Sequence, residues 1–113
     1  MKKLIIFLLV SLSIHAQDLR IEPLHWWVGM KNPKLQLLIH GKNLSGGEVV
    51  AKKQGLKIVK VHEADSPNYL FVDCEIAKNA SAGSYPIDIK KGGKIIHHFD
   101  YQLQAREKNS ANR

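Results

Sequence analysis

The feature that most constrains this fold is an alternation of apolar and polar residues, with a period of two, through the second half of the chain. It runs through residues 69–76, 84–90 and 95–104. Successive side chains of a strand point to opposite faces, so this alternation predicts strands with one buried and one solvated face. Gly92 and Gly93 separate the last two segments and are typical of a tight hairpin turn. We therefore expect a β-hairpin at the end of the domain.

The first half of the chain predicts four more strands with a less regular pattern. They cover residues 19–22, 35–41, 48–53 and 56–63. Turn-forming residues lie between them, at Asn32-Pro33, Asn43–Gly47, Gln54-Gly55 and Asp65–Asn68. No segment has a helical period. About seven short strands in roughly 90 residues predict an all-β, two-sheet sandwich of immunoglobulin type.

Local motifs support an immunoglobulin-like sandwich. Ala82–Ile87 has the form of a tyrosine corner, in which Tyr85 enters the penultimate strand just after a turn. Ile39–Leu44 resembles the strand exit of early-set immunoglobulin-like domains. Cys74 is the only cysteine, so no intrachain disulfide can form and packing alone must join the sheets. Cys74 lies on the apolar face of its strand, which predicts a buried, unreactive thiol.

The N-terminal residues predict a signal peptide rather than part of the domain. Lys2 and Lys3 precede an uninterrupted apolar run, Leu4–Ile14, which is too short to span a bilayer. Ala16 offers a small residue for cleavage. We therefore expect a signal peptide at 1–16, a sandwich domain at 17–104, and a linker or frayed C-terminus at 105–113. The mature chain would be exported and would have no membrane partner.

The positive charge does not indicate a nucleic-acid partner. The formal net charge is +7, and it falls to +5 without Lys2 and Lys3. The remaining lysines are spread over many segments and arginines are few, whereas a nucleic-acid binder concentrates both on one element. Lysines on sheet edges and loops explain the charge, because they block unwanted strand pairing.

The adjacent tryptophans, Trp26 and Trp27, are the most informative residues for function. Neighbours on a strand face opposite sides, so one ring can enter the core while the other faces outward. An outward ring either packs against a neighbouring domain or stacks on the apolar face of a sugar. Both interpretations remain open from the residue types. The candidate residues for a carbohydrate or domain interface are Trp26, Trp27, Met30, Lys31, Asn32 and Tyr69.

Several ordered sequence blocks carry a resemblance to a known family. They lie at residues 26–37 (Trp-Trp-Val-Gly-Met-Lys-Asn-Pro-x-Leu-Gln-Leu), 41–44, 66–73, 82–94 and 101–106. Together they resemble the N-terminal immunoglobulin-like domain of cyclomaltodextrinases and neopullulanases from Bacteroidetes-type bacteria, in the alpha-amylase family. The resemblance implies a module that precedes a (β/α)8 barrel in the same chain. That barrel hydrolyses α-1,4 bonds of cyclodextrins, maltooligosaccharides or pullulan.

The resemblance also implies what this chain does not carry. The family's nucleophile, acid/base and calcium ligands lie in the barrel, which needs about 250 residues. The acidic residues predict no facing carboxyl pair, because Asp73 and Glu75 share one outward strand face and Asp88 and Asp100 lie outward near hairpin ends. The histidines have no metal-ligand spacing. We therefore expect no enzyme activity from the chain alone, no cofactor and no metal.

The expected function is an accessory module of a secreted, maltodextrin-hydrolysing enzyme. The module would pack on the barrel, contribute homodimer contacts and present an aromatic residue to the substrate cleft. Its location would be periplasmic or extracellular. The alternatives are a free-standing protein that binds α-glucan or cyclodextrin, and a structural sandwich of the cell envelope.

Overall fold

The computed structural model of the protein describes residues 19–106, which form eight strands and no helix. The expected signal peptide at 1–16 lies outside the described residues, as does the expected C-terminal tail from residue 107 onward. The strands are β1 (Arg20–Glu22), β2 (His25–Trp27), β3 (Lys34–His40), β4 (Glu48–Ala51), β5 (Leu56–Glu63), β6 (Tyr69–Ile76), β7 (Gly83–Lys91) and β8 (Lys94–Gln104).

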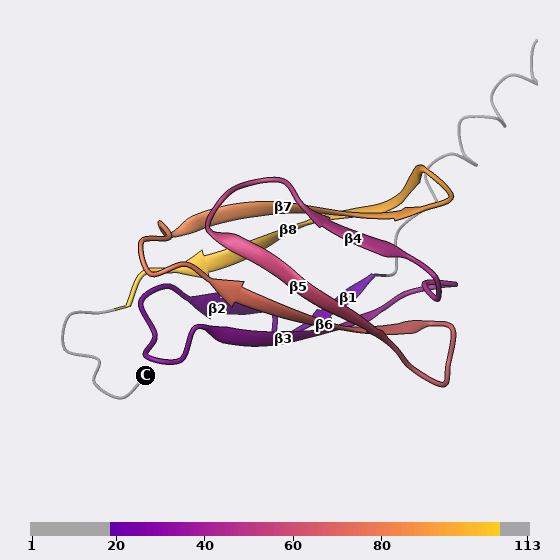
Figure 1. Cartoon of the computed structure of the whole chain (residues 1–113), viewed down its shortest axis with the longest axis horizontal. Helices are drawn as coiled ribbons and strands as arrows, with labels where there is room; N and C mark the ends of the chain where they lie inside the picture. Colours follow the sequence, from indigo (N-terminus) through magenta and orange to yellow (C-terminus); the bar gives the residue numbers. More distant parts are fainter. Residues whose placement is uncertain (1–18, 107–113) are drawn as a thin grey trace, which may run out of the picture.

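The strands form two packed layers, as Figure 1 shows. The first sheet has the order β1-β3-β6-β5, and the second sheet has the order β2-β8-β7-β4. The all-β, two-sheet prediction is therefore confirmed. Within residues 19–106, no helix could span a membrane.

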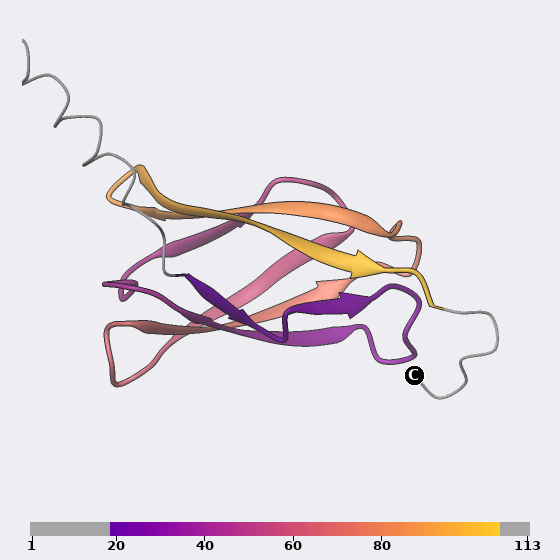
Figure 2. The same ribbon diagram turned by 180° about the vertical axis from the view of Figure 1, so that it is seen from behind.

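The strand that the sequence did not predict is β2, so the sandwich has eight strands rather than seven. β1 pairs antiparallel with β3 in the first sheet, and β2 pairs parallel with β8 in the second. The chain thus changes sheets at Pro23, along one side of the sandwich (Figure 2). The Tyr101 hydroxyl donates a hydrogen bond of 2.7 Å to the Pro23 carbonyl oxygen and holds this crossing in place.

The core lies between the sheets and consists of the inward residues of the alternating strands. Its fully buried members include Leu37, Ile39, Leu70, Val72, Tyr85, Ile87, Ile89, Tyr101 and Leu103. Cys74 is buried among them, as predicted, and burial raises the pKa of its thiol to about 12.

The tyrosine corner is also confirmed. The Tyr85 hydroxyl donates a hydrogen bond of 2.6 Å to the carbonyl oxygen of Ser81, four residues upstream. Gly55 lies directly against this ring, because a Cβ built on it would stand 2.9 Å from the Tyr85 hydroxyl oxygen. The turn between β4 and β5 thus packs onto the corner.

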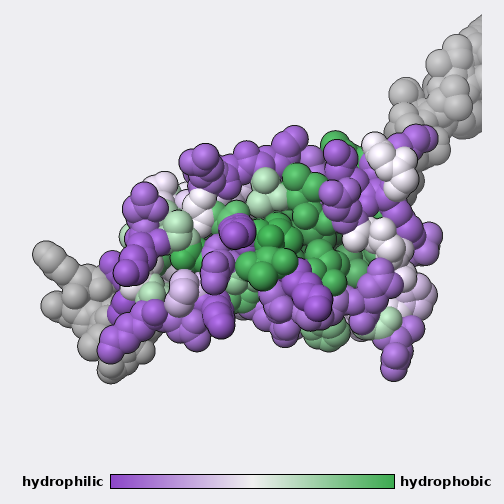
Figure 3. Space-filling model, in the orientation of Figure 1, coloured by the Kyte–Doolittle hydropathy of each residue, from purple (hydrophilic) through white to green (hydrophobic). Residues whose placement is uncertain are grey.

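The edges of the two sheets meet at an apolar area. β4 and β5 are edge strands, one from each sheet, and Figure 3 shows hydrophobic surface in the middle of the face on which they lie. A hollow of about 500 Å³ here has a lining of apolar residues, Val49, Val50, Ala51, Leu56 and Ile58, together with the polar Glu48, Gln54 and Lys57. A register shift between Ile58 and Lys60 interrupts the pairing of β5. Such irregular, lysine-bearing edges resist pairing with further strands.

Candidate functional site

The loop that follows Trp27 is fixed by backbone hydrogen bonds to two other parts of the chain. The Val28 amide donates to the carbonyl oxygen of Gln104, the last residue of β8, at 3.0 Å. The Ile76 amide, at the end of β6, donates to the Pro33 carbonyl oxygen at 2.9 Å. The loop therefore has a defined position between the ends of β6 and β8.

Two further hydrogen bonds shape the same loop. Gly29 has a φ of +73°, a conformation that favours glycine, and its carbonyl oxygen accepts a 2.8 Å hydrogen bond from Nη1 of Arg106. The Asn32 side-chain oxygen accepts a 3.0 Å bond from the Lys34 amide, which caps the turn before β3. Arg106, which the sequence analysis assigned to a linker, thus holds the loop from the C-terminal side.

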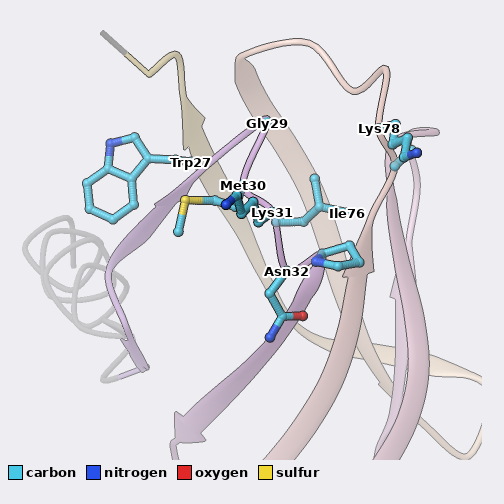
Figure 4. A pocket seen from close by; sticks show the side chains of 9 residues that line it. Trp27, Gly29, Met30, Lys31, Asn32, Ile76 and Lys78 are labelled. Carbon is cyan, nitrogen blue, oxygen red and sulfur yellow. The ribbon is translucent and has the colours of Figure 1, made fainter. Parts of the chain in front are cut away.

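This loop and the end of β6 enclose an open hollow of about 340 Å³. Its lining consists of Trp27, Gly29, Met30, Lys31, Asn32, Pro33, Ile76, Ala77 and Lys78. We call it the Trp27 hollow. In Figure 4 the Met30 side chain extends toward the Trp27 indole. Four of the six residues proposed from the sequence, Trp27, Met30, Lys31 and Asn32, therefore lie together.

The two tryptophans have different neighbours, although both are half-buried and their ring centroids are 5.5 Å apart. Trp26 is opposite Leu103 in the ladder and packs against the core, while Trp27 is opposite Gln104 and lines the hollow. The Trp27 ring contacts His25 edge-on, with 5.2 Å between ring centroids. Trp26 is thus a packing residue, and Trp27 is the ring available to a partner.

The Trp27 hollow is positively charged. Lys31 and Lys78 contribute to its lining, which contains no Asp or Glu. Apolar surface comes from Trp27, Met30 and Ile76. A partner that fits here would present apolar groups together with acceptor or acidic groups.

Tyr69, the sixth proposed residue, lies elsewhere. It begins β6 and is paired with His40, whereas Ile76 of the Trp27 hollow ends the same strand. Seven residue steps along a strand correspond to about 23 Å. The two places are also on different surfaces, because Tyr69 faces outward from the first sheet beside His40, with ring centroids 4.6 Å apart. The sequence-based set therefore comprises two separate places.

The structure corrects the expectation for Asp88, which faces outward but is buried, with 5% of its surface exposed. His98 on β8 lies opposite, with its Nδ1 2.6 Å from Asp88 Oδ1, and Lys52 Nζ is 3.3 Å from Oδ2. The His98 hydrogen bond lowers the pKa of Asp88 despite burial, and Lys52 contributes to the same effect. The same bond raises the pKa of His98, with a further contribution from Asp100. Lys52 and His98 come from distant segments, which explains why this cluster could not be predicted from the sequence.

Asp73 is similarly tied to neighbours rather than simply solvated. Its carboxylate accepts a 2.9 Å bond from the Gln36 side-chain amide and lies 2.7 Å from Nε2 of His62. These bonds, led by that to His62, lower its pKa. Within residues 19–106, no group of three or more His, Cys, Asp or Glu side chains is placed to hold a metal ion.

Comparison with known proteins places these features in a family context. Residues 20–107 match the profile of a family described as "Cyclomaltodextrinase, N-terminal". Among solved structures, the chain is similar to the BIgI domain of beta protein from S. agalactiae, solved bound to CEACAM1. That similarity has 11% sequence identity and a TM-score of 0.41, over 81% of this chain and 100% of that chain.

Proposed function

Because this chain belongs to the family of cyclomaltodextrinase N-terminal domains, we propose that it packs through the Trp27 hollow against the catalytic barrel of an alpha-amylase-family enzyme. Membership of this family makes the chain an accessory module of such an enzyme. The Trp27 hollow is where we propose the contact. In this role the module binds and positions the barrel, and the barrel carries the chemistry.

One observation carries the proposal: the Trp27 hollow lies where the folded domain ends. Val28 is bonded to Gln104, the last residue of the last strand, and Arg106 is bonded to Gly29. A domain that follows β8 in the same chain would begin beside this loop. The half-buried Trp27 ring and Met30 would then be covered by it, which removes their apolar surface from water.

The test is binding of the chain to a cyclomaltodextrinase barrel from which the enzyme's own N-terminal domain has been deleted. We expect the Trp27 indole signal to shift in NMR spectra on addition of the barrel. Trp27→Ala should weaken binding about tenfold or more, as expected for loss of a buried aromatic anchor. The matched control is Leu24→Ala, since Leu24 is an exposed apolar residue of the same segment that does not line the hollow. Equal affinity of the two variants would contradict the proposal.

A sugar is the other partner that suits Trp27, and one observation favours it. The ring lines the same hollow as Asn32 and Lys31, whose polar side chains can bond to hydroxyl groups. Tryptophan fluorescence during titration with maltoheptaose or β-cyclodextrin separates the two partners. A saturable change that is lost in Trp27→Ala would support contact of Trp27 with substrate. Unchanged fluorescence would contradict sugar binding at Trp27 and would be consistent with contact between Trp27 and the barrel alone.

We further propose that residues 1–16 direct export to the periplasm or beyond, on the basis of the basic residues and apolar run described above. Mass spectrometry of the protein expressed in a bacterial host with an intact Sec system tests this. The expected N-terminus is Gln17. Recovery of the uncleaved chain from the cytoplasm would refute it.

Homodimer contacts are the last part of the proposed role. The apolar area between β4 and β5 supports such a contact, since monomeric proteins rarely expose large apolar patches. Sedimentation velocity over a range of concentrations tests it. A chain that stays monomeric at high concentration would contradict homodimer contacts and would not affect the proposed packing on the barrel.

A further inference from the structure

The outer face of the first sheet carries an unusual group of side chains. Leu38, His40, His62, Tyr69 and Phe71 are all half-buried there, and we call them the outer-face cluster. The hydrophobic core includes none of them. The outer face of a sandwich sheet is normally polar. The second sheet follows this rule, since Ser84, Asp88, His98, Asp100 and Gln102 alternate with its core residues.

Strand register brings the members of the outer-face cluster together. Phe71 on β6 is flanked by Leu38 on β3 and His62 on β5. The next outward row has Tyr69 beside His40, whose rings are tilted by 40°. Neighbouring strands lie about 4.8 Å apart, so the rings form one continuous surface. The cluster is therefore a broad aromatic platform and not a set of scattered residues.

Polar groups border the platform on two sides, and on one side they are fixed in place. Asp73 accepts bonds from Gln36 and His62, which orients its carboxylate. Its side chain remains 38% exposed, so solvent or a ligand can still reach it. On the other side, Arg20 and Glu22 line a hollow of about 230 Å³ together with Leu38, His40 and Tyr69.

This arrangement matches the chemistry of a sugar better than that of a protein surface. A pyranose ring has apolar C–H faces and a border of hydroxyl groups, which pack on aromatic rings and bond to carboxylates and amides, respectively. A flat apolar protein surface would instead bury Asp73, Glu22 and Arg20 without partners, at a high free-energy cost. The mixture of rings and oriented polar groups thus favours a carbohydrate.

We propose that the outer-face cluster, with Asp73 and Gln36, is a binding site for an α-1,4-linked glucan chain. The choice of glucan rests on the proposed function as a module of a maltodextrin-hydrolysing enzyme. The site lies away from the Trp27 hollow, so the domain holds substrate on one surface and the barrel on another. Retained substrate would then be close to the enzyme that cleaves it.

The experiment is an NMR titration of the full chain with maltoheptaose, with tryptophan fluorescence recorded in parallel. We expect saturable shifts at Tyr69, Phe71 and His62 and no change in tryptophan emission, because Trp26 packs against the core and Trp27 lines the other site. Tyr69→Ala should weaken binding about tenfold. The matched control is Ile96→Ala, which removes an exposed apolar residue from the hairpin of the second sheet and should leave affinity unchanged.

The outcomes separate this inference from the proposed function. Shifts confined to Trp27 and Met30, or no shifts at millimolar sugar, would overturn it without affecting barrel packing. Failure of the barrel to bind, with maltoheptaose still shifting Tyr69 and Phe71, would overturn barrel packing and leave the glucan site. Asp73→Asn provides a second variant, since it keeps the side-chain volume and should still weaken binding. Unchanged affinity in both Tyr69→Ala and Asp73→Asn would also refute the site.

Discussion

The Tyr85 hydroxyl and the Ser81 carbonyl oxygen are 2.6 Å apart and join the turn before β7 to the buried ring that follows it. Tyr85→Phe removes this bond and leaves the carbonyl without its donor. We expect a loss of about 1–2 kcal/mol in the free energy of unfolding, measured by urea denaturation. Tyr69→Phe is the control, because its hydroxyl lies on the outer face, and it should change stability by less than about 0.5 kcal/mol. Equal effects of the two substitutions would contradict this role for the corner.

Gly55 and Gly92 form a matched pair for testing close approach. Gly55 has a φ of +116° and leaves room for Tyr85, since an added Cβ would meet the ring at 3.0 Å and its hydroxyl at 2.9 Å. Gly92 has a φ of +60° with nothing within 4 Å. Gly55→Ala should therefore destabilise the fold by roughly 2–4 kcal/mol. Gly92→Ala should cost about 1 kcal/mol, from backbone conformation alone. Similar unfolding midpoints for the two variants would show that contact with Tyr85 is unimportant.

The Asp88–His98 pair predicts a stability maximum at mildly acidic pH. The pKa of Asp88 is lowered, so its contribution is present above its ordinary value of 3.8 and is lost as pH falls through the folded-state value. The pKa of His98 is raised, so its contribution is complete below its ordinary value of 6.5 and is lost as pH rises through the folded-state value. The two contributions overlap between 3.8 and 6.5.

Urea denaturation at about pH 5.5 and about pH 8.5 measures this effect. In the unmodified chain the midpoint should be higher at the lower pH. His98→Gln should reduce the difference, because the pairing with Asp88 then no longer depends on protonation. His97→Gln is the control, since His97 is adjacent to His98 in sequence but is paired with Ile89 and faces the opposite side of β8. A pH dependence that persists in His98→Gln and disappears in His97→Gln would contradict this prediction, because the effect would then come from His97.

Cys74 should be unreactive in the folded chain. Burial raises the pKa of its thiol to about 12, so the thiolate needed for alkylation is nearly absent at neutral pH. We expect iodoacetamide to label Cys74 at least about a hundredfold more slowly in buffer than in denaturing urea. The same burial predicts no disulfide-linked dimer on oxidation. Rapid labelling of the folded chain would indicate that the strand opens easily.

The sequence predicted the fold where one face of a strand is buried and the other is not. β6 and most of β8 follow this rule, and their alternation was sufficient. β2 was missed because a strand of three residues, His25–Trp27, is too short to show a period. Ile95 continues the alternation of Phe99, Tyr101 and Leu103 in the sequence but is 55% exposed, because a register shift between Ile89 and Lys90 changes the pairing near the hairpin turn.

Only the part of the candidate site whose residues are close in sequence was predicted. Trp27, Met30, Lys31 and Asn32 are close in sequence, so their proximity follows from a single loop. Tyr69 was grouped with them, yet its place at the far end of β6 depends on how the strands are ordered in the sheet. The cluster around Asp88 depends on Lys52 and His98, whose approach is set by long-range pairing. Single-residue patterns carry no information on such contacts.

The parallel pairing of β2 with β8 has a mechanical consequence. A force that separates the two ends of the domain pulls β2 toward its start and β8 toward its end, so the two strands must slide past each other. The hydrogen bonds between them, together with the bond from Val28 to Gln104, then bear the load at the same time and do not open one after another. The domain is therefore built to resist stretching along its length.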